Sequence, residues 1–485
     1  MRLTALNPPG PWRMLSAILV VVCWSAAHAS DADPVGWDLL QRDVELQNET
    51  LTNTHRAALE SLDLANHTAM VSAADQFTAL LASIESNHPQ LRKVQLNAAI
   101  AYTAVGDTES AMKVVTAALA SAMVTLGPYH LELIPYMLAE GDVLARQDQP
   151  SAAISAYQRA QNVSHRQMGV YNPDQMTAIE RVIRVAANRG TRRIVETQLR
   201  LMLKIAEESL GGEDVARLQL ELAAHYKRRC DSTDPSIRND PEAPGVPLRF
   251  AFGQIAAGYY KDAIETLAGL EESEQQLYAM RNLAHTWSLI DRQRRSRKSI
   301  RAYIASAREI YANNESALAR ALVHAGDIHM ILGDQQAFSA YREAWQLLEQ
   351  DPDLQGSLLG TPVRLKPASV ETAFLARKPE STNHNDPLYV HFGFTVRENG
   401  RPAKVQTLYS NVFAEQRRVS RSRLMRMIFR PRFKAGVAVP TAGFEHVQPF
   451  RVGAPDALLP WNQKKLEAKR AAEKAADASR FGDAG

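Results

Sequence analysis

The chain has 485 residues, enough for more than one large hydrophobic core, and its formal net charge of +3 is close to neutral for that length. A nucleic-acid-binding protein would carry a clear basic excess, so that class is disfavoured. The chain has 2 cysteines, Cys23 and Cys230. Only Cys230 remains after the cleavage inferred below, so no intrachain disulfide is expected.

The first 29 residues have the pattern of a secretory signal peptide. Arg2 and Arg13 precede a short apolar core at residues 14–23, and Ala27-His28-Ala29 is a small-residue cleavage site. The apolar run is shorter than the about 20 residues that a transmembrane helix needs. We therefore expect cleavage after Ala29 and export; an uncleaved membrane anchor is the alternative.

Residues 30–350 are predicted to form a helical repeat array. The stretch is rich in Ala, Leu, Gln and Glu and has almost no alternating β-branched runs. Small residues recur at a period of 42, as between Ala111 and Ala153 and between Ala118 and Ala160. Ala or Gly at a helix crossing lets two backbones approach, and stacked helix pairs bury one continuous core.

Residues at equivalent places mark the successive repeats. The first two units are marked by Ala99, Tyr102, Gly106, Ala111 and Ala118, and by Gly141, Leu144, Ala153, Tyr157 and Ala160. A weaker third unit contains Val182, Gly190, Val195 and Leu199, and later units centre on 258–263 and on 325–344. The pattern is similar to the tetratricopeptide (TPR) repeat family, in its longer kinesin-light-chain type. That resemblance implies an α-solenoid with a concave surface for protein partners; an ordinary helical bundle is the alternative.

Two proline-rich stretches interrupt the helical pattern. Residues 231–248 contain four prolines and several aspartates, which predict a long loop or a joint between two blocks. Residues 351–386 are interpreted as a linker for the same reason. The charged, Ala-rich tail, residues 454–485, is expected to be a solvated helix or disordered.

Residues 387–453 have the pattern of a small α+β domain. Strands are expected at 389–396 and about 403–409, joined at Asn399-Gly400, a pair typical of hairpin turns in which both residues have φ > 0. A helix is expected at 412–429, ended by Pro431, and a last strand at 447–452. The predicted order is strand–strand–helix–strand, ββαβ.

Several short motifs follow this order. They are Phe392, Phe394 and Val396, the turn at 399–401, Ser410, the run Phe429-Arg-Pro-Arg-Phe433 with Gly436 and Val439, and the run Gln448-Pro-Phe-Arg-Val452. Together they resemble the C-terminal domain of the TonB energy-transducer family over residues 387–452. The resemblance implies a bacterial periplasmic setting and contact with outer-membrane transporters by strand pairing. Energy transducers of that family have a membrane helix and a Pro-rich spacer, where this chain has a cleavable start and a helical array.

The sequence shows no motif for catalysis, metal binding or a cofactor. HExxH, CxxC, GxSxG, Walker and GxGxxG patterns are absent, and the 13 histidines are scattered without metal-ligand spacing. Cys230 has no catalytic companions in the sequence. We therefore expect a protein that is not an enzyme, with no catalytic residues, no metal and no cofactor.

Two surfaces are candidate binding sites. The last strand is expected at a sheet edge, where it would pair with a partner strand; the residues are Val447, Gln448, Phe450, Arg451 and Val452. Pro449 has no N–H and would limit that pairing. The second surface is the basic stretch at 417–434, whose candidate residues are Arg417, Arg418, Arg421, Arg423 and Arg426. A solvated helix face is the favoured interpretation; binding of an acidic partner or an anionic envelope polymer is the alternative.

The leading interpretation is a non-enzymatic periplasmic interaction protein. Its protein partners would contact the concave repeat surface and the C-terminal edge strand, and no nucleic acid is expected. One alternative is a membrane-anchored TonB-type transducer variant. Another is a structural protein that binds an envelope polymer. Membrane contact is expected only through partners or an uncleaved anchor.

The signal-peptide interpretation predicts the mature N-terminus. Protein recovered from a bacterial periplasm should have an intact mass that begins at Ser30, because the cleavage site ends at Ala29. Mass spectrometry of the whole protein measures this directly. A protein that retains the first 29 residues and sediments with membranes would instead establish the anchored alternative.

Overall fold

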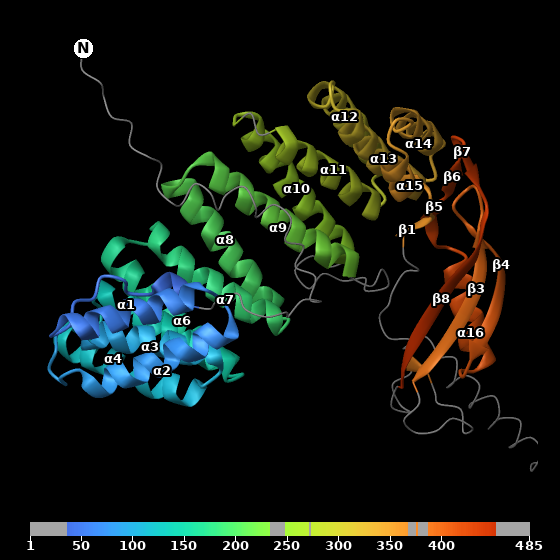
Figure 1. The fold of residues 1–485 in the computed structure, drawn as a ribbon. Coiled ribbons are helices and arrows are strands. Elements are labelled where there is room, and N and C mark those ends of the chain that lie inside the picture. Colours follow the sequence, from blue (N-terminus) through green and yellow to red (C-terminus); the bar gives the residue numbers. More distant parts are fainter. Residues whose placement is uncertain (1–35, 233–247, 271–272, 367–374, 377–386, 453–485) are drawn as a thin grey trace, which may run out of the picture. The chain divides into compact units, whose positions relative to one another are not determined.

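The computed structural model describes residues 36–232, 248–270, 273–366, 375–376 and 387–452 (Figure 1). The chain divides into two compact units, Met1–Leu210 and Gly211–Gly485. The predicted signal peptide, the tail at 454–485 and most of the break at 231–248 lie outside the described residues. Each unit is considered by itself below.

Unit 1 consists of four helix pairs after a short N-terminal segment. The helices are α1 (Glu49–Asp63), α2 (His67–Ser83), α3 (Leu91–Val105), α4 (Thr108–Leu126), α5 (Ile134–Arg146), α6 (Pro150–Met168), α7 (Met176–Asn188) and α8 (Arg192–Ser209). Three 3-10 turns accompany them: η3 (Trp37–Leu39), η4 (Leu131–Leu133) and η5 (Pro173–Gln175). Asn48, Asn66 and Asp107 cap helix N-termini, each accepting a backbone N–H three residues on.

The predicted 42-residue period is present in this unit. Ala111 and Ala118 on α4, and Ala153 and Ala160 on α6, are all completely buried. Each second helix therefore meets its neighbours at alanines in the same place. The weak third unit of the sequence is the pair α7 and α8, with Gly190 in the connecting turn at φ 68°. The prediction of stacked helix pairs is confirmed.

Unit 2 begins with three further helix pairs. Its helices are α9 (Gly212–Ser232), α10 (Leu248–Ala268), α11 (Ser273–Leu289), α12 (Gln293–Ile310), α13 (Glu315–Ile331), α14 (Gln336–Leu347) and the short α15 (Pro352–Leu359). Gly326 on α13 lies against the ring of Tyr341 on α14, as Gly141 on α5 lies against Tyr157 on α6. The same close crossing therefore recurs in both units.

The C-terminal part of unit 2 is a small α+β domain. Its elements are β1 (Val363–Lys366), β2 (Leu375–Ala376), β3 (Leu388–Val396), β4 (Pro402–Ser410), α16 (Ala414–Leu424), β5 (Ile428–Arg430), β6 (Arg432–Lys434), β7 (Val437–Val439) and β8 (Thr441–Val452). The main sheet has the order β2-β8-β3-β4, in which β3 is antiparallel to both β4 and β8. The predicted strand–strand–helix–strand order is therefore present, with extra short strands between the helix and the last strand.

Several predictions for this domain are wrong in detail. The helix ends at Leu424 instead of residue 429, because 428–430 forms β5 and pairs with β1. Of the predicted turn residues Asn399 and Gly400, only Gly400 has φ > 0. The Gly400 N–H donates to the Arg397 carbonyl at 2.9 Å, so the loop is longer than a two-residue turn. The linker at 351–386 contains α15 and β1: Pro352 lies at the first position of α15, where proline is compatible with a helix.

The domain is also not independent of the repeats. Ile428 and Phe433 belong to the same hydrophobic core as Leu322, Ala337 and Tyr341 of the last helix pair. The Phe433 ring meets the Tyr341 ring edge-on, with 5.5 Å between centroids. The strands β5 and β6 therefore cover the face that α13 and α14 would otherwise expose to water (Figure 1).

The close crossing at Gly326 generates a stability prediction. A Cβ added there would lie 2.5 Å from the ring of buried Tyr341, so Gly326→Ala should lower the free energy of unfolding by about 1–3 kcal/mol through overpacking. Gly258→Ala is the matched control: Gly258 lies within α10, and no atom lies within 4 Å of the added carbon. The control should raise stability by up to about 1 kcal/mol, since Ala is the better helix former. Urea titration of both variants measures this, and equal effects would contradict the assigned crossing.

Candidate interaction surfaces

The N-terminal segment, residues 36–46, lies across the first helices of the unit 1 pairs. The Gln41 backbone N–H donates to Asn97 Oδ1 at 2.8 Å, and Asn97 Nδ2 donates to the Gln41 carbonyl at 2.7 Å. Leu39 and Val44 of the segment are buried. The side-chain amide of Asn97 on α3 thus bonds to both the backbone N–H and the backbone carbonyl of Gln41. These two hydrogen bonds do not depend on which side chain the segment carries at that position.

A buried ion-pair network holds the beginning of the same segment. Arg181 on α7 donates from Nη2 to Asp38 at 2.6 Å and from Nε to both carboxylate oxygens of Asp142 on α5, at 3.2 Å. Tyr157 Oη donates to Asp142 at 2.7 Å. Burial raises the pKa of Asp142, whereas Arg181 and Tyr157 lower it. Removing one member of a buried pair commonly costs about 3–5 kcal/mol, so these contacts fix α5, α7 and the segment together.

Unit 2 contains a similar buried aspartate, but its arginine partner comes from a different kind of element. Asp327 on α13 accepts from Tyr341 Oη at 2.8 Å, as Asp142 accepts from Tyr157. Its cationic partner is Arg430 of β5, with Nη1 at 3.4 Å, and not an arginine of a following repeat. The strand β5 therefore stands where the next first helix would stand.

Among the described residues, the first part of the last strand, residues 441–445, has a ladder partner on one side only. On one side β8 pairs with β3 from Thr441 to Phe450. On the other side Arg451 and Val452 pair with Leu375 and Ala376 of β2, and His446 and Phe450 have interaction partners of their own. The prediction that β8 is the outermost strand is therefore wrong at 451–452, and the stretch with a ladder partner on one side only, among the described residues, is 441–445. Val447 is 49% exposed, whereas Gln448 and Phe450 are buried on the opposite face.

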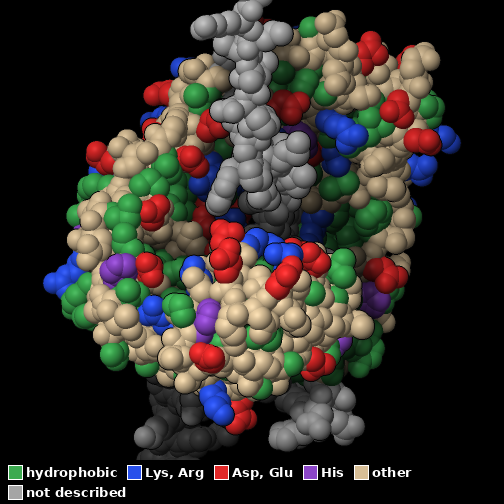
Figure 2. All heavy atoms as spheres, turned by 60° about the vertical axis from the view of Figure 1, so that its left-hand side comes forward, with side chains coloured by type: hydrophobic (Ala, Val, Ile, Leu, Met, Phe, Trp, Pro, Cys, Tyr) green, Lys and Arg blue, Asp and Glu red, His purple; other side chains and the backbone are tan. Residues whose placement is uncertain are grey.

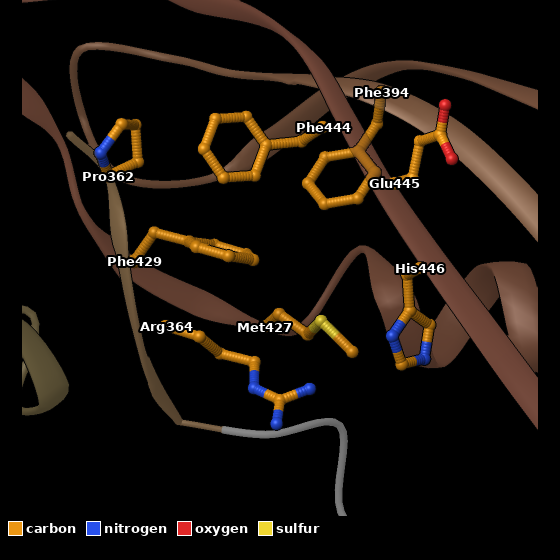
Figure 3. A pocket seen from close by; sticks show the side chains of 8 residues that line it. All are labelled: Pro362, Arg364, Phe394, Met427, Phe429, Phe444, Glu445 and His446. Carbon is orange, nitrogen blue, oxygen red and sulfur yellow. The ribbon is translucent and has the colours of Figure 1, made fainter.

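A small hollow of about 200 Å³ adjoins this strand (Figure 3). The rings of Phe394, Phe429 and Phe444 form its apolar wall, and Arg364 of β1 lies at its rim. The remaining lining residues are Pro362, Met427, Glu445 and His446. The hollow offers an apolar space beside an open sheet edge, with charged groups at its margin.

The predicted basic surface forms only in part. Arg417, Arg418 and Arg421 on α16, and Arg426 after it, are exposed. Arg423 is half-buried and already has an interaction partner. Figure 2 shows acidic and basic side chains interspersed over the face that it displays.

No group of three or more His, Cys, Asp or Glu side chains in the described part of the chain could hold a metal ion. Burial raises the pKa of the Cys230 thiol to about 11, which disfavours the reactive thiolate. One described helix, α4, is long and apolar enough to cross a membrane, but it buries Ala111, Val115 and Ala118 within the repeat array.

Comparison with known proteins gives a fold-level likeness only. No protein-family model matches the chain, and no curated protein matches it. Among solved structures, kinesin-light-chain TPR-like repeats from Podosopora anserina are 14% identical and cover 47% of this chain and 100% of that one, with a TM-score of 0.34. The C-terminal part of a TPR repeat-containing protein from Cytophaga hutchinsonii is 12% identical, covers 62% and 96%, and gives a TM-score of 0.39.

A third likeness is to a signal transduction ATPase with a tetratricopeptide repeat sensor from Pyrococcus horikoshii. It is 10% identical, covers 63% of this chain and 43% of that one, and has a TM-score of 0.40. With TM-scores below 0.5, these likenesses do not establish a family. The surfaces described above therefore depend on their own geometry.

The Asp327 contact predicts a pH dependence of stability. Burial raises the pKa of Asp327 to about 6, against the opposing effects of Arg430 and Tyr341. A carboxyl whose pKa is raised in the folded state stabilises the fold fully below its unfolded value of 3.8, and this contribution is lost as pH rises through about 6. The wild type should therefore lose stability relative to Asp327→Asn between about pH 4 and 6, by on the order of 1–3 kcal/mol.

Urea titrations of the whole chain across this pH range make the measurement. Glu349→Gln, at an exposed position after α14, is the matched control and should track the wild type at every pH. A wild-type curve parallel to that of Asp327→Asn would contradict the assignment.

Proposed function

We propose that this protein is a non-enzymatic interaction scaffold of the bacterial periplasm, and that β8 takes up an extended segment of a partner protein. The observation that carries this proposal is the side of β8 at residues 441–445 that has no ladder partner among the described residues. Backbone N–H and C=O groups on an unpaired edge bind an added strand through main-chain hydrogen bonds. The adjoining hollow supplies a place for one apolar side chain of that strand.

The partner class follows from the resemblance to the TonB C-terminal domain. In that family the partners are segments of outer-membrane transporters. The sheet order here is β4-β3-β8-β2, and β2 pairs with β8 only at 451–452, so residues 441–445 of the corresponding strand remain available for a partner. The export pattern at 1–29 and the helical array favour a released scaffold over a membrane-anchored energy transducer. The exposed arginines of α16 favour a second candidate, contact with an anionic envelope polymer.

Hydrogen exchange on the whole chain tests the proposal. The probes are synthetic peptides with sequences of periplasm-facing transporter segments, and mass spectrometry follows exchange with and without each peptide. Binding at the sheet edge should slow exchange within 441–445, because amides there gain partners, and should leave 414–426 unchanged. The double variant Arg417→Gln/Arg421→Gln should bind as the wild type does.

Two outcomes would count against strand addition. Slower exchange confined to 414–426, lost in the double variant, would favour the polymer-binding candidate. No change in exchange with any transporter segment would remove the support for this partner class.

A further inference from the structure

Unit 2 carries a cluster of nitrogen-bearing side chains on the first helices of its three pairs. The Lys227 cluster consists of Lys227 on α9, Arg281 and His285 on α11, and His324 on α13. All four side chains are partly exposed. They are therefore accessible to a ligand, although protein surrounds much of each side chain.

The contacts place these groups close together. Arg281 Nη1 lies 3.3 Å from both ring nitrogens of His324, so the guanidinium lies against the imidazole. Lys227 Nζ donates to Oδ1 of Asn282, the residue after Arg281, at 3.0 Å. A salt bridge to either Lys227 or Arg281 is absent among the described residues, and both side chains can still donate further hydrogen bonds.

Within the described part of the chain, no acidic side chain forms an ion pair with Lys227 or Arg281. Burial lowers the pKa of Lys227, and Arg281 acts in the same direction; Asp231, on the same helix, opposes them. Burial, together with Lys227 and Arg281, lowers the pKa of His285 to about 3. The other nearby acid, Asp327, is already engaged by Arg430 and Tyr341. An incoming carboxylate would therefore meet cations that the protein itself balances poorly.

In unit 1, side chains at positions equivalent to His324 bind another segment of the chain. His324 lies three residues before the buried Asp327, and Ala139 lies three residues before the buried Asp142, so the two positions are equivalent. Arg281 lies 43 residues before His324, close to one repeat earlier. At the 42-residue period Asn97 and Arg181 occupy the place of Ala139. Both side chains bind the segment 36–46. Asn97 bonds to the backbone of Gln41, and Arg181 bonds to the carboxylate of Asp38.

We propose that the Lys227 cluster binds an extended acidic segment of a partner protein, with one carboxylate between Lys227 and Arg281. The bound segment would resemble 36–46 of this chain, which contains Asp38, Asp43 and Glu45 together with leucine and valine. Charge-assisted hydrogen bonds from ammonium and guanidinium groups to a carboxylate are stronger than neutral ones. This surface deepens the scaffold function but is separate from β8, so either site can fail without the other.

The probe is a fluorescein-labelled peptide with the sequence of residues 36–46, GWDLLQRDVEL. A second peptide carries Asn and Gln in place of its Asp and Glu residues. Fluorescence anisotropy with the whole chain at low ionic strength should show saturable binding of the acidic peptide only. Lys227→Gln and Arg281→Gln should each weaken binding by about tenfold or more, as for truncated charge contacts at other interfaces. Arg294→Gln, on the exposed first turn of α12, makes the same charge change and should have no effect.

Thermal melts establish that each variant is folded, and Lys227→Gln carries the test if Arg281→Gln does not fold. Equal binding by Lys227→Gln, Arg294→Gln and the wild type would overturn the proposal. So would equal binding of the neutral peptide, or no binding by the wild type. Loss of binding in Asn97→Ala, with Lys227→Gln unaffected, would place the ligand on unit 1 and also overturn it.

Discussion

A helix pair can cover only one of its two broad faces by itself, and the neighbour that covers the other determines where each further element lies. In unit 1 the neighbour is the next pair, brought close by alanines such as Ala111 and Ala153 that leave room for a second backbone. In unit 2 the last pair meets β5 and β6 instead, through Ile428 and Phe433. The small sheet is thus fixed by the same requirement that stacks the helices.

Buried aspartates fix the orientation of these neighbours. Asp142 and Asp327 each accept a tyrosine hydroxyl from within the pair and a guanidinium from the next element. Apolar contact is non-directional, whereas two converging hydrogen bonds at a carboxylate define one register. The arginine comes from helix α7 in unit 1 and from strand β5 in unit 2. The aspartate therefore binds the same two kinds of group in both units, although the arginine lies on a different type of element.

The sequence predicted the parts of the fold that local patterns encode. Alanines at a fixed period indicated the helix pairs, and alternation around Phe392 and Phe394 indicated the sheet. The contact between the last helix pair and the small sheet had no such signal. Arg430 and Asp327 are 103 residues apart, and the sequence around each shows no distinctive pattern. The helix at 412–429 was extended too far for the same reason: Ile428 fits a helical face, but pairing with distant β1 determines its conformation.

The candidate surfaces were predicted less completely than the fold. The open edge of β8 followed from the strand order, whereas its pairing with β2 at 451–452 depended on residues outside the recognised domain pattern. The Lys227 cluster and the Asn97 contact were missed, since single polar residues on successive helices resemble solvated positions. Aligning the first repeats at their 42-residue period would have placed Asn97 and Arg181 at the same position.

The direct attachment of the sheet to the helices has a mechanical consequence. Arg430 bonds α13, β5 pairs with β1, and β1 follows α15 after only a few residues. A pull applied along β8 would therefore reach the repeat array through a hydrogen-bonded ladder and a buried ion pair, and not through a slack tether. Tension on a captured segment would therefore be transmitted to α13 through contacts that are already formed.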